Sequence, residues 1–371
     1  MEFFHKINAY GVESNNSLIW GENYHVLKLL KNKYKNKIQC IYADPPYNTC
    51  QCFDGFNDSL SHRKWSRMMK KRLKLLWSFL SDTGFIWISI DDAEFGNLKL
   101  LCDKLWGKEK FVSTIVRQKN KFPSSHERPI VHMHDYILVY AKNSSKAKFN
   151  SKSLEKFMCI ESINEEDSLN WRPANLLIRC SSLPKSSNQS EYIFSIDTPI
   201  HGKITPPKGK CWSVNCSEYR RLLQENKIWF DGNDPFPYIK YSFSENPILL
   251  PTTMWNSDLV DTNQAARMEI AKYNSNKFFY VPKPEKLISV ILEMSTNPGD
   301  FVLDPFLGSG TTAVVAQKMG RQWIGIEKEE YQCNKICFER LKDTIDGNEE
   351  SSINKILHWT GGGGFSFYKT K

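Results

Sequence analysis

A carboxylate, two prolines and an aromatic ring follow one another in the segment Asp44-Pro45-Pro46-Tyr47. The apolar run Ile38 to Ala43 before it predicts a buried strand, which must end here because proline cannot continue a central ladder. Asp44 would then lie at the carboxyl end of a strand, where open α/β sheets bind their ligands. A planar base with an exocyclic amino group suits this segment, since it could donate to Asp44 and the Pro45 carbonyl while Tyr47 stacks on the ring. The alternative is a strand that ends in a tight turn exposed to solvent.

A second strand end whose residues could bind a ligand lies near the end of the chain. Residues 301–304 predict a strand that runs through the glycine-rich turn Gly308-Ser309-Gly310 into a helix. The glycines let the backbone approach a ligand closely, and the helix N-terminus offers free N–H groups. A further strand, Gln322 to Ile326, ends at Glu327, whose carboxylate could accept both hydroxyls of a ribose. This pattern indicates a nucleotide-containing ligand.

The same glycine turn leaves a second enzyme class open. Gly308-x-Gly310-x-x-Ala313 fits the fingerprint of dinucleotide-binding folds, so a nicotinamide-dependent dehydrogenase is an alternative. A phosphate-binding P-loop is excluded, because no Lys-Ser or Lys-Thr follows the glycines.

The two strand ends together resemble a known family. Asp44-Pro45-Pro46-Tyr47 resembles the catalytic motif of the DNA amino-methyltransferases, which methylate adenine N6 or cytosine N4, and Asp304-Pro305-Phe306 before the glycines resembles their S-adenosylmethionine site. Leu18–Asn23, Ile88–Asp92 and the order of the motifs resemble the beta class, in particular the modification subunits of type III restriction-modification systems. The similarity covers most of residues 17–145 and 240–345.

The resemblance implies a fold and an organisation of the chain. The fold is the class I S-adenosylmethionine-dependent methyltransferase fold, an α/β fold with a doubly wound, mostly parallel sheet. It would be permuted, with the catalytic half before the cofactor half, and would carry an inserted target-recognition region. The corresponding boundaries are residues 1–143 for the catalytic half, 144–257 for the insertion, 258–345 for the cofactor half and 346–371 for a C-terminal tail.

The resemblance also assigns roles to individual residues. Asp44, Pro45, Pro46 and Tyr47 would form the catalytic motif. The cofactor is S-adenosyl-L-methionine, with Asp304 on its amino group, Lys283 on its carboxylate, Glu327 on the ribose and Glu22 near its adenine; Phe306, Gly308 and Gly310 would line the methionine and ribose portion.

The implied reaction is methylation of adenine N6 in double-stranded DNA at a short specific sequence after base flipping. Cytosine N4 is the first alternative, because it presents the same amino geometry, but Asp44 before Pro-Pro-Tyr favours adenine. A DNA-binding module with a dead site is less expected, since Asp44 and the two glycines are intact. Cytosine C5 methylation is not expected, because no Pro-Cys pair supplies the required nucleophile.

Basic residues gather in two segments that could contact a phosphate backbone. The amphipathic pattern of residues 65–80 predicts a helix whose outer surface carries cations without an acid nearby. A second basic run, residues 104–128, includes a loop. A solvated helix face is the alternative interpretation of the first segment. The predicted DNA contacts are Arg63, Lys64, Lys70, Lys71, Arg117, Lys119 and Lys121.

Composition limits the remaining possibilities. A formal charge of +9 over 371 residues favours a polyanionic partner. The chain has no apolar stretch long enough for a membrane span, and its ten cysteines fit reduced thiols in a cytoplasm. No metal is expected, although His126, His132 and His134 are candidate ligands by residue type. The resemblance implies a homodimer, and any restriction activity would lie in another chain, because no nuclease or helicase motif is present.

Overall fold

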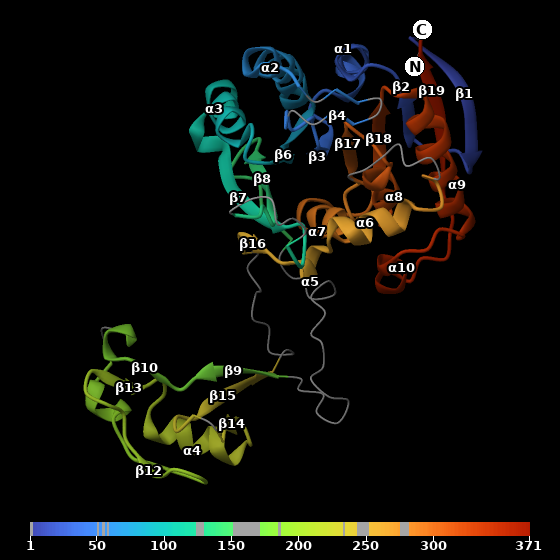
Figure 1. Ribbon diagram of the computed structural model, residues 1–371. Coiled ribbons are helices and arrows are strands. Elements are labelled where there is room, and N and C mark those ends of the chain that lie inside the picture. Colours follow the sequence, from blue (N-terminus) through green and yellow to red (C-terminus); the bar gives the residue numbers. More distant parts are fainter. Residues whose placement is uncertain are drawn as a thin grey trace. The chain divides into compact units, whose positions relative to one another are not determined.

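The chain divides into two compact units (Figure 1), one formed by residues 1–159 and 249–371 and the other by residues 160–248. Each unit has its own hydrophobic core. The computed structural model describes residues 3–49, 52–53, 56–57, 59–123, 130–150, 171–184, 187–232, 234–242, 252–274 and 282–371.

The larger unit is built on a ten-stranded sheet. Six neighbouring strands in its middle are parallel, and the strands β1, β8 and β7 add antiparallel pairs toward its two edges. In spatial order the strands are β1 (Phe4–Gly11), β19 (Gly364–Thr370), β2 (Ser17–Trp20), β18 (Gln322–Glu327), β17 (Phe301–Asp304), β3 (Ile38–Ala43), β6 (Leu80–Ile90), β8 (His134–Ala141), β7 (Phe111–Gln118) and β16 (Met254–Trp255).

Helices cover both faces of this sheet (Figure 1), which makes it doubly wound. Side chains alternate along β3: Ile41 packs in one core, and Cys40 and Tyr42 in the other. The fold class and the order of the two halves therefore agree with the prediction. The helices on the Ile41 side are α1 (Asn23–Tyr34), α2 (His62–Phe79) and α3 (Phe95–Trp106); the Tyr42 side has α5 (Ser257–Val260), α7 (Glu285–Ser295), α8 (Thr311–Lys318), α9 (Phe338–Asp346) and α10 (Ser352–Leu357). The helix α6 (Asn263–Ile270) adjoins α7, where Glu269 accepts from the Glu285 backbone N–H at 3.1 Å.

The catalytic and cofactor segments, far apart in sequence, lie on neighbouring strands. β17 pairs in parallel with β3 on one side and with β18 on the other. The carboxyl ends of parallel strands meet at one edge of a sheet. Asp44, Asp304 and Glu327 therefore lie at the same edge.

The C-terminal tail, for which no chemistry is predicted, is part of the sheet. β19 pairs with β1 and β2, so the two ends of the chain lie side by side (Figure 1). Glycine is required in this region, because a Cβ on Gly364 would lie 2.1 Å from the Val12 carbonyl oxygen. The glycine run could serve flexibility or a close backbone contact, and the close contact is the one observed.

The smaller unit has short strands around a core that includes Trp212, Tyr219 and Ile239. Its role in target recognition stays a prediction. Its elements are β9 (Trp171–Asn175), β10 (Leu177–Arg179), β11 (Ile196–Thr198), β12 (Gly202–Ile204), β13 (Lys210–Trp212), α4 (Cys216–Gln224), β14 (Ile228–Trp229) and β15 (Tyr238–Ser242). Across the described residues of both units, every helix is too short or too polar to cross a lipid bilayer.

A buried ionic network ties the helices of the cofactor half together. Arg340 on α9 donates to Glu285 Oε1 at 2.6 Å, and Lys318 on α8 donates to Glu285 Oε2 at 2.7 Å and also to Glu349. Glu349 is buried by this pairing, although its segment has the composition of a polar linker. Burial and the charge of Glu285 raise the pKa of Glu269 to about 8, so one carboxyl of the network stays protonated near neutral pH.

We predict that Arg340→Met destabilises the larger unit far more than a substitution that removes an exposed ion pair with the same N···O distance. Removing Arg340 leaves the buried Glu285 partly uncompensated, which costs about 3–5 kcal/mol. Lys272→Met is the matched control, because Lys272 Nζ lies 2.6 Å from Asp343 Oδ2 but is 64% exposed. The control should cost about 1 kcal/mol or less in urea unfolding. Equal losses for the two variants would contradict the role given to burial.

Candidate active site

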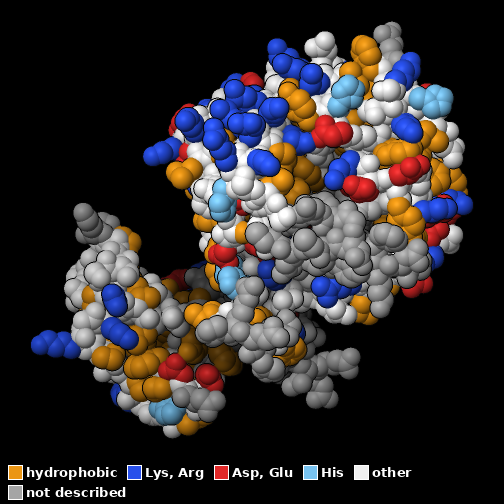
Figure 2. All heavy atoms as spheres, turned by 45° about the horizontal axis from the view of Figure 1, so that its top comes forward, with side chains coloured by type: hydrophobic (Ala, Val, Ile, Leu, Met, Phe, Trp, Pro, Cys, Tyr) orange, Lys and Arg blue, Asp and Glu red, His pale blue; other side chains and the backbone are white. Residues whose placement is uncertain are grey.

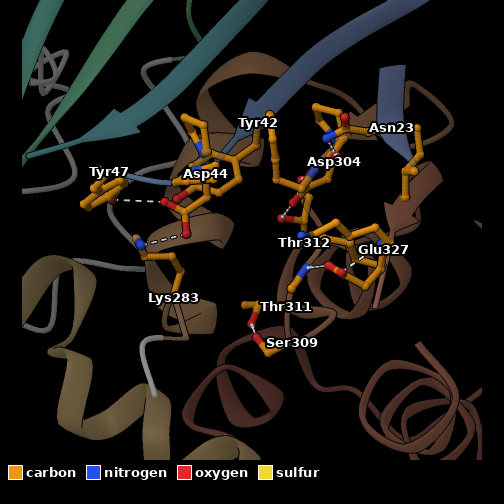
Figure 3. A pocket seen from close by; sticks show the side chains of 18 of the residues that line it. Asn23, Tyr42, Asp44, Tyr47, Lys283, Asp304, Ser309, Thr311, Thr312 and Glu327 are labelled. Atoms are coloured by element: carbon orange, nitrogen blue, oxygen red, sulfur yellow. Dashed lines mark hydrogen bonds and ion pairs between the residues drawn. The ribbon is translucent and has the colours of Figure 1, made fainter. Parts of the chain in front are cut away.

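A cavity of about 790 Å³ lies at the carboxyl edge of the sheet. Both predicted strand ends line it, the segment Asp44–Tyr47 after β3 and residues 304–309 after β17. Figure 3 shows Asp44 with Lys283 on one side of the cavity and Asp304 with Glu327 on the other. The structure thus brings the catalytic and cofactor motifs to one place.

The carboxylate of Asp44 is held by two donors. Lys283 Nζ lies 2.7 Å from Oδ2, and the Tyr47 hydroxyl donates to Oδ1 at 3.0 Å. Lys283 is buried, and its ammonium lies 5.1 Å from the centroid of the Tyr47 ring. Burial and the charge of Asp44 raise the pKa of the Tyr47 hydroxyl well above its ordinary value, so Tyr47 stays neutral. Lys283, predicted to meet the cofactor carboxylate, here meets Asp44.

Two contacts that sequence reasoning missed fix the proline turn. Trp65 Nε1 on α2 donates to the Pro46 carbonyl at 2.7 Å. Asn48 adopts a φ of 61°, and its side chain donates to the buried Glu94 at 2.7 Å. A left-handed asparagine directly after Pro-Pro-Tyr is a usable sequence signal, because asparagine tolerates this conformation. Nothing local points to Glu94, which is distant in the sequence.

Asp304 is a buried carboxylate at the end of β17. Its oxygens accept from the Phe306 backbone N–H at 2.9 Å and from the Thr312 hydroxyl at 2.6 Å. Burial raises its pKa to about 7, and the charges of Asp44 and Glu327 act in the same direction. Asp304 therefore changes charge close to neutral pH.

Glu327 organises the glycine turn from the neighbouring strand. Its carboxylate accepts from the backbone N–H of Gly308 at 2.9 Å and from that of Lys328 at 2.8 Å. Gly308 and Gly310 have φ values of 57° and 85°, which glycine adopts without strain. Burial raises the pKa of Glu327, with its backbone hydrogen bonds opposing. Arg340 holds the turn from behind, donating to the Ser309 carbonyl at 3.3 Å.

Glu22 lies at the rim of the cavity and caps a helix. Its carboxylate accepts from the His25 backbone N–H at 3.0 Å, as the N-cap of α1, and pairs with Arg72 of α2. Asn23, a residue without a predicted role, donates to the Pro305 carbonyl at 2.8 Å. The segment around Glu22 is thereby linked to the cofactor turn.

Asp91 and Asp92 line the same cavity after β6. Asp92 accepts from the Tyr136 hydroxyl at 2.9 Å, and His132 Nδ1 lies 2.8 Å from its other oxygen. His126 lies outside the described residues. Among the described residues, no cluster of three or more His, Cys, Asp and Glu side chains is arranged to hold a metal.

Four of the predicted DNA contacts lie on the exposed face of α2, where cations gather (Figure 2). Among the described Lys and Arg residues of this helix, Arg72 is the one that pairs with an acid, Glu22. The four are Arg63, Lys64, Lys70 and Lys71, and Arg67 and Lys74 share their face.

The other three predicted DNA contacts differ in exposure. Lys121 is exposed, and Lys119 lines the cavity, where its ammonium lies 2.8 Å from Asp135. Arg117 is fully buried and donates to Asn263 at 2.9 Å. The prediction for Arg117 thus needs correction: its charge is directed inward, because buried acceptors satisfy it, and it is not on the surface that DNA would meet.

The assembled groups define what the cavity can accommodate. On one side are a carboxylate and an aromatic ring at a rigid turn, which suit an amino-bearing planar base. On the other side are buried carboxylates and a glycine turn at a helix N-terminus, which suit a ligand with an amino group and a ribose.

Comparisons with known proteins agree with this arrangement. The model of the N6 and N4 methyltransferase family, described as DNA methylase, matches residues 38–338. The chain is 31% identical to the probable type III restriction-modification enzyme HindVI Mod subunit of Haemophilus influenzae, over 98% of this chain and 55% of that protein. It is 30% identical to the type II methyltransferase M.KpnI of Klebsiella pneumoniae, over 83% of this chain and 78% of that protein.

Among solved structures, the PvuII DNA methyltransferase (cytosine-N4-specific) aligns with a TM-score of 0.48 and 14% identity, over 93% of this chain and 94% of that chain. The chain spans about half the length of the HindVI subunit and of the StyLTI Mod subunit of Salmonella typhimurium. The family match extends from β3 to α9 and so includes both the Asp44 turn and the glycine turn. The chain therefore belongs to the N6/N4 DNA methylase family.

Proposed function

We propose that this protein transfers a methyl group from S-adenosyl-L-methionine to adenine N6 in double-stranded DNA, at a short specific sequence. The observation that carries the proposal is that Asp44 and the glycine turn at Gly308 line one cavity. Membership of the DNA methylase family supports DNA as the substrate. Asp44 before Pro-Pro-Tyr supports adenine over cytosine.

The cofactor side of the cavity fits S-adenosyl-L-methionine. Asp304 is buried and accepts from only two donors of the chain in the described structure, so it can also accept from an ammonium group. Glu327 borders the cavity at the end of the next strand and would receive the ribose hydroxyls. Phe306 and Gly308 line the cavity and would lie along the remainder, whereas Gly310 lies outside the lining and shapes the turn with its φ of 85°. When bound, the cofactor supplies an electrophilic methyl group.

Asp44 and the Pro45 carbonyl would prepare the amino nitrogen of the target base. The lone pair of this nitrogen is delocalised into the ring, which makes adenine a poor nucleophile. Two hydrogen bonds to fixed acceptors favour a pyramidal nitrogen with its lone pair directed across the cavity. Trp65 holds the adjacent Pro46 carbonyl, so the acceptors are fixed before the base arrives. Positioning would supply most of the acceleration.

Lys283 lies where it can act on both sides of the cavity. It pairs with Asp44 in the structure and also lines the cavity that would hold the cofactor. The base amino group must share Asp44 with Lys283 and Tyr47, since both carboxylate oxygens have donors. A cofactor carboxylate would compete for the same ammonium and release one oxygen of Asp44.

A base within a duplex cannot reach this cavity, so the proposed reaction requires base flipping. The exposed cations of α2 would hold the phosphate backbone. The similar proteins named as Mod subunits of restriction-modification enzymes support a restriction subunit in another chain as a partner, and a homodimer stays a prediction. The cytoplasmic location stays a prediction from the cysteine content.

We expect Asp44→Ala to lower the methylation rate by about 100-fold or more, because one of two preorganised acceptors is lost. Cofactor binding should be retained, because Asp304 and Glu327 are unchanged in this variant. Labelled methyl transfer to DNA and mass analysis of the modified nucleoside provide the measurement. Asp82→Ala is the control, since Asp82 is an exposed carboxylate paired with Lys146. Turnover retained by Asp44→Ala would contradict the catalytic role of Asp44. N4-methylcytosine as the product would show that the target base is cytosine and not adenine.

Cofactor affinity should fall as the pH decreases from 8 to 6. The pKa of Asp304 is raised to about 7, so protonation below that pH removes the charge that would attract the cofactor ammonium. The loss should approach about tenfold per pH unit below the pKa if only the ionised form binds. Calorimetry over this range would measure it. In Asp304→Asn, affinity should be weak and nearly independent of pH; the parent's pH dependence persisting in this variant would exclude Asp304 as its origin.

A further inference from the structure

The connection between β7 and β8 emerges at the edge of the sheet that holds the active site. β8 is antiparallel to both β6 and β7, so β7 runs in the same direction as β6. The carboxyl end of β7 therefore lies at the edge where β6 ends at Ile90, next to Asp91. Gln118 pairs with His134 at the base of this connection.

Both stems of the connection border the cavity itself. Lys119 and His132 contribute to its lining. The backbone N–H of Lys119 donates to the Met133 carbonyl at 2.9 Å, which closes the base of the connection. Residues beyond this bond start from the mouth of the proposed active site. Phe122 is three residues further on, which corresponds to at most about 10 Å of extended chain.

This connection carries the two most exposed large hydrophobic side chains of the described residues. Phe122 is 75% exposed and Ile130 is 80% exposed. Single exposed apolar residues are common, but these two belong to one connection whose stem residues Lys119 and His132 line the cavity. Neither side chain contributes to a core cluster of the larger unit. Lys121, exposed next to Phe122, lies 3.8 Å from the exposed carboxylate of Asp258.

We propose that Phe122 is a wedge that enters the DNA base stack at the place the flipped base leaves. Flipping unpairs and unstacks one base, and an inserted apolar side chain restores part of the lost stacking. The exposed lysines on α2 match the charge of the DNA backbone. This inference rests on the proposed function, because it presupposes DNA in the cavity.

The test compares a duplex with a substrate that needs no flipping. Phe122→Ala should methylate the duplex about tenfold more slowly, which corresponds to one lost stacking contact of about 1.4 kcal/mol. On DNA whose target base lies opposite an abasic site, the variant should reach at least half the rate of the unchanged protein. With 2-aminopurine at the target position, the fluorescence increase on binding should fall by at least half. Phe122→Trp should methylate both the duplex and the DNA with the abasic site at the rates of the unchanged protein.

Controls distinguish a wedge from a general loss of DNA binding and from a contact between two copies of the chain. Leu100→Ala removes a comparably exposed side chain, 69% exposed, on α3 and should leave both rates unchanged. Full duplex activity in Phe122→Ala, or an equal loss on both substrates, would overturn the wedge. A change in oligomeric mass in Phe122→Ala by light scattering would also overturn it, because the surface would then join two copies. No methylation of either substrate by the unchanged protein would instead overturn the proposed function.

Discussion

The parallel pairing of β17 with β3 is the constraint on which the rest of this structure depends. It places the strand that ends at Asp304 beside the strand that ends next to Asp44, although about 260 residues separate them in the chain. One cavity then receives a carboxylate with an aromatic ring from one strand and a glycine turn from the next. Methyl transfer is a question of bringing two reactants together in line, so this adjacency provides most of what the chemistry requires.

Buried polar contacts make the two strand ends rigid. Trp65 holds the Pro46 carbonyl on the catalytic side, and Arg340 holds the Ser309 carbonyl on the cofactor side. Arg340 also pairs with Glu285, two residues after Lys283, which reaches Asp44. The cofactor turn and the catalytic carboxylate are therefore connected through one chain of fixed contacts. Preorganised acceptors of this kind need little rearrangement when the ligands arrive.

The sequence predicted what local chemistry encodes and missed what distant contacts decide. Prolines mark the end of β3 and glycines follow the end of β17, so the fold class and the cavity could be predicted from the sequence. The strand β19 could not be predicted, because its position in the sheet depends on Gly364 packing against the Val12 backbone. Arg117 lies in a basic run of the sequence, and only the structure shows that its guanidinium is buried against Asn263 and Asp135.

A crystal structure with an S-adenosylmethionine analogue that carries an amine in place of the methyl-sulfonium group would test the central claim most directly. We predict that the adenosine lies against Glu327 and the glycine turn, with the amine directed across the cavity at Asp44. An analogue bound with its amine directed away from Asp44, or bound outside this cavity, would contradict the claim that the two strand ends form one methyl-transfer site.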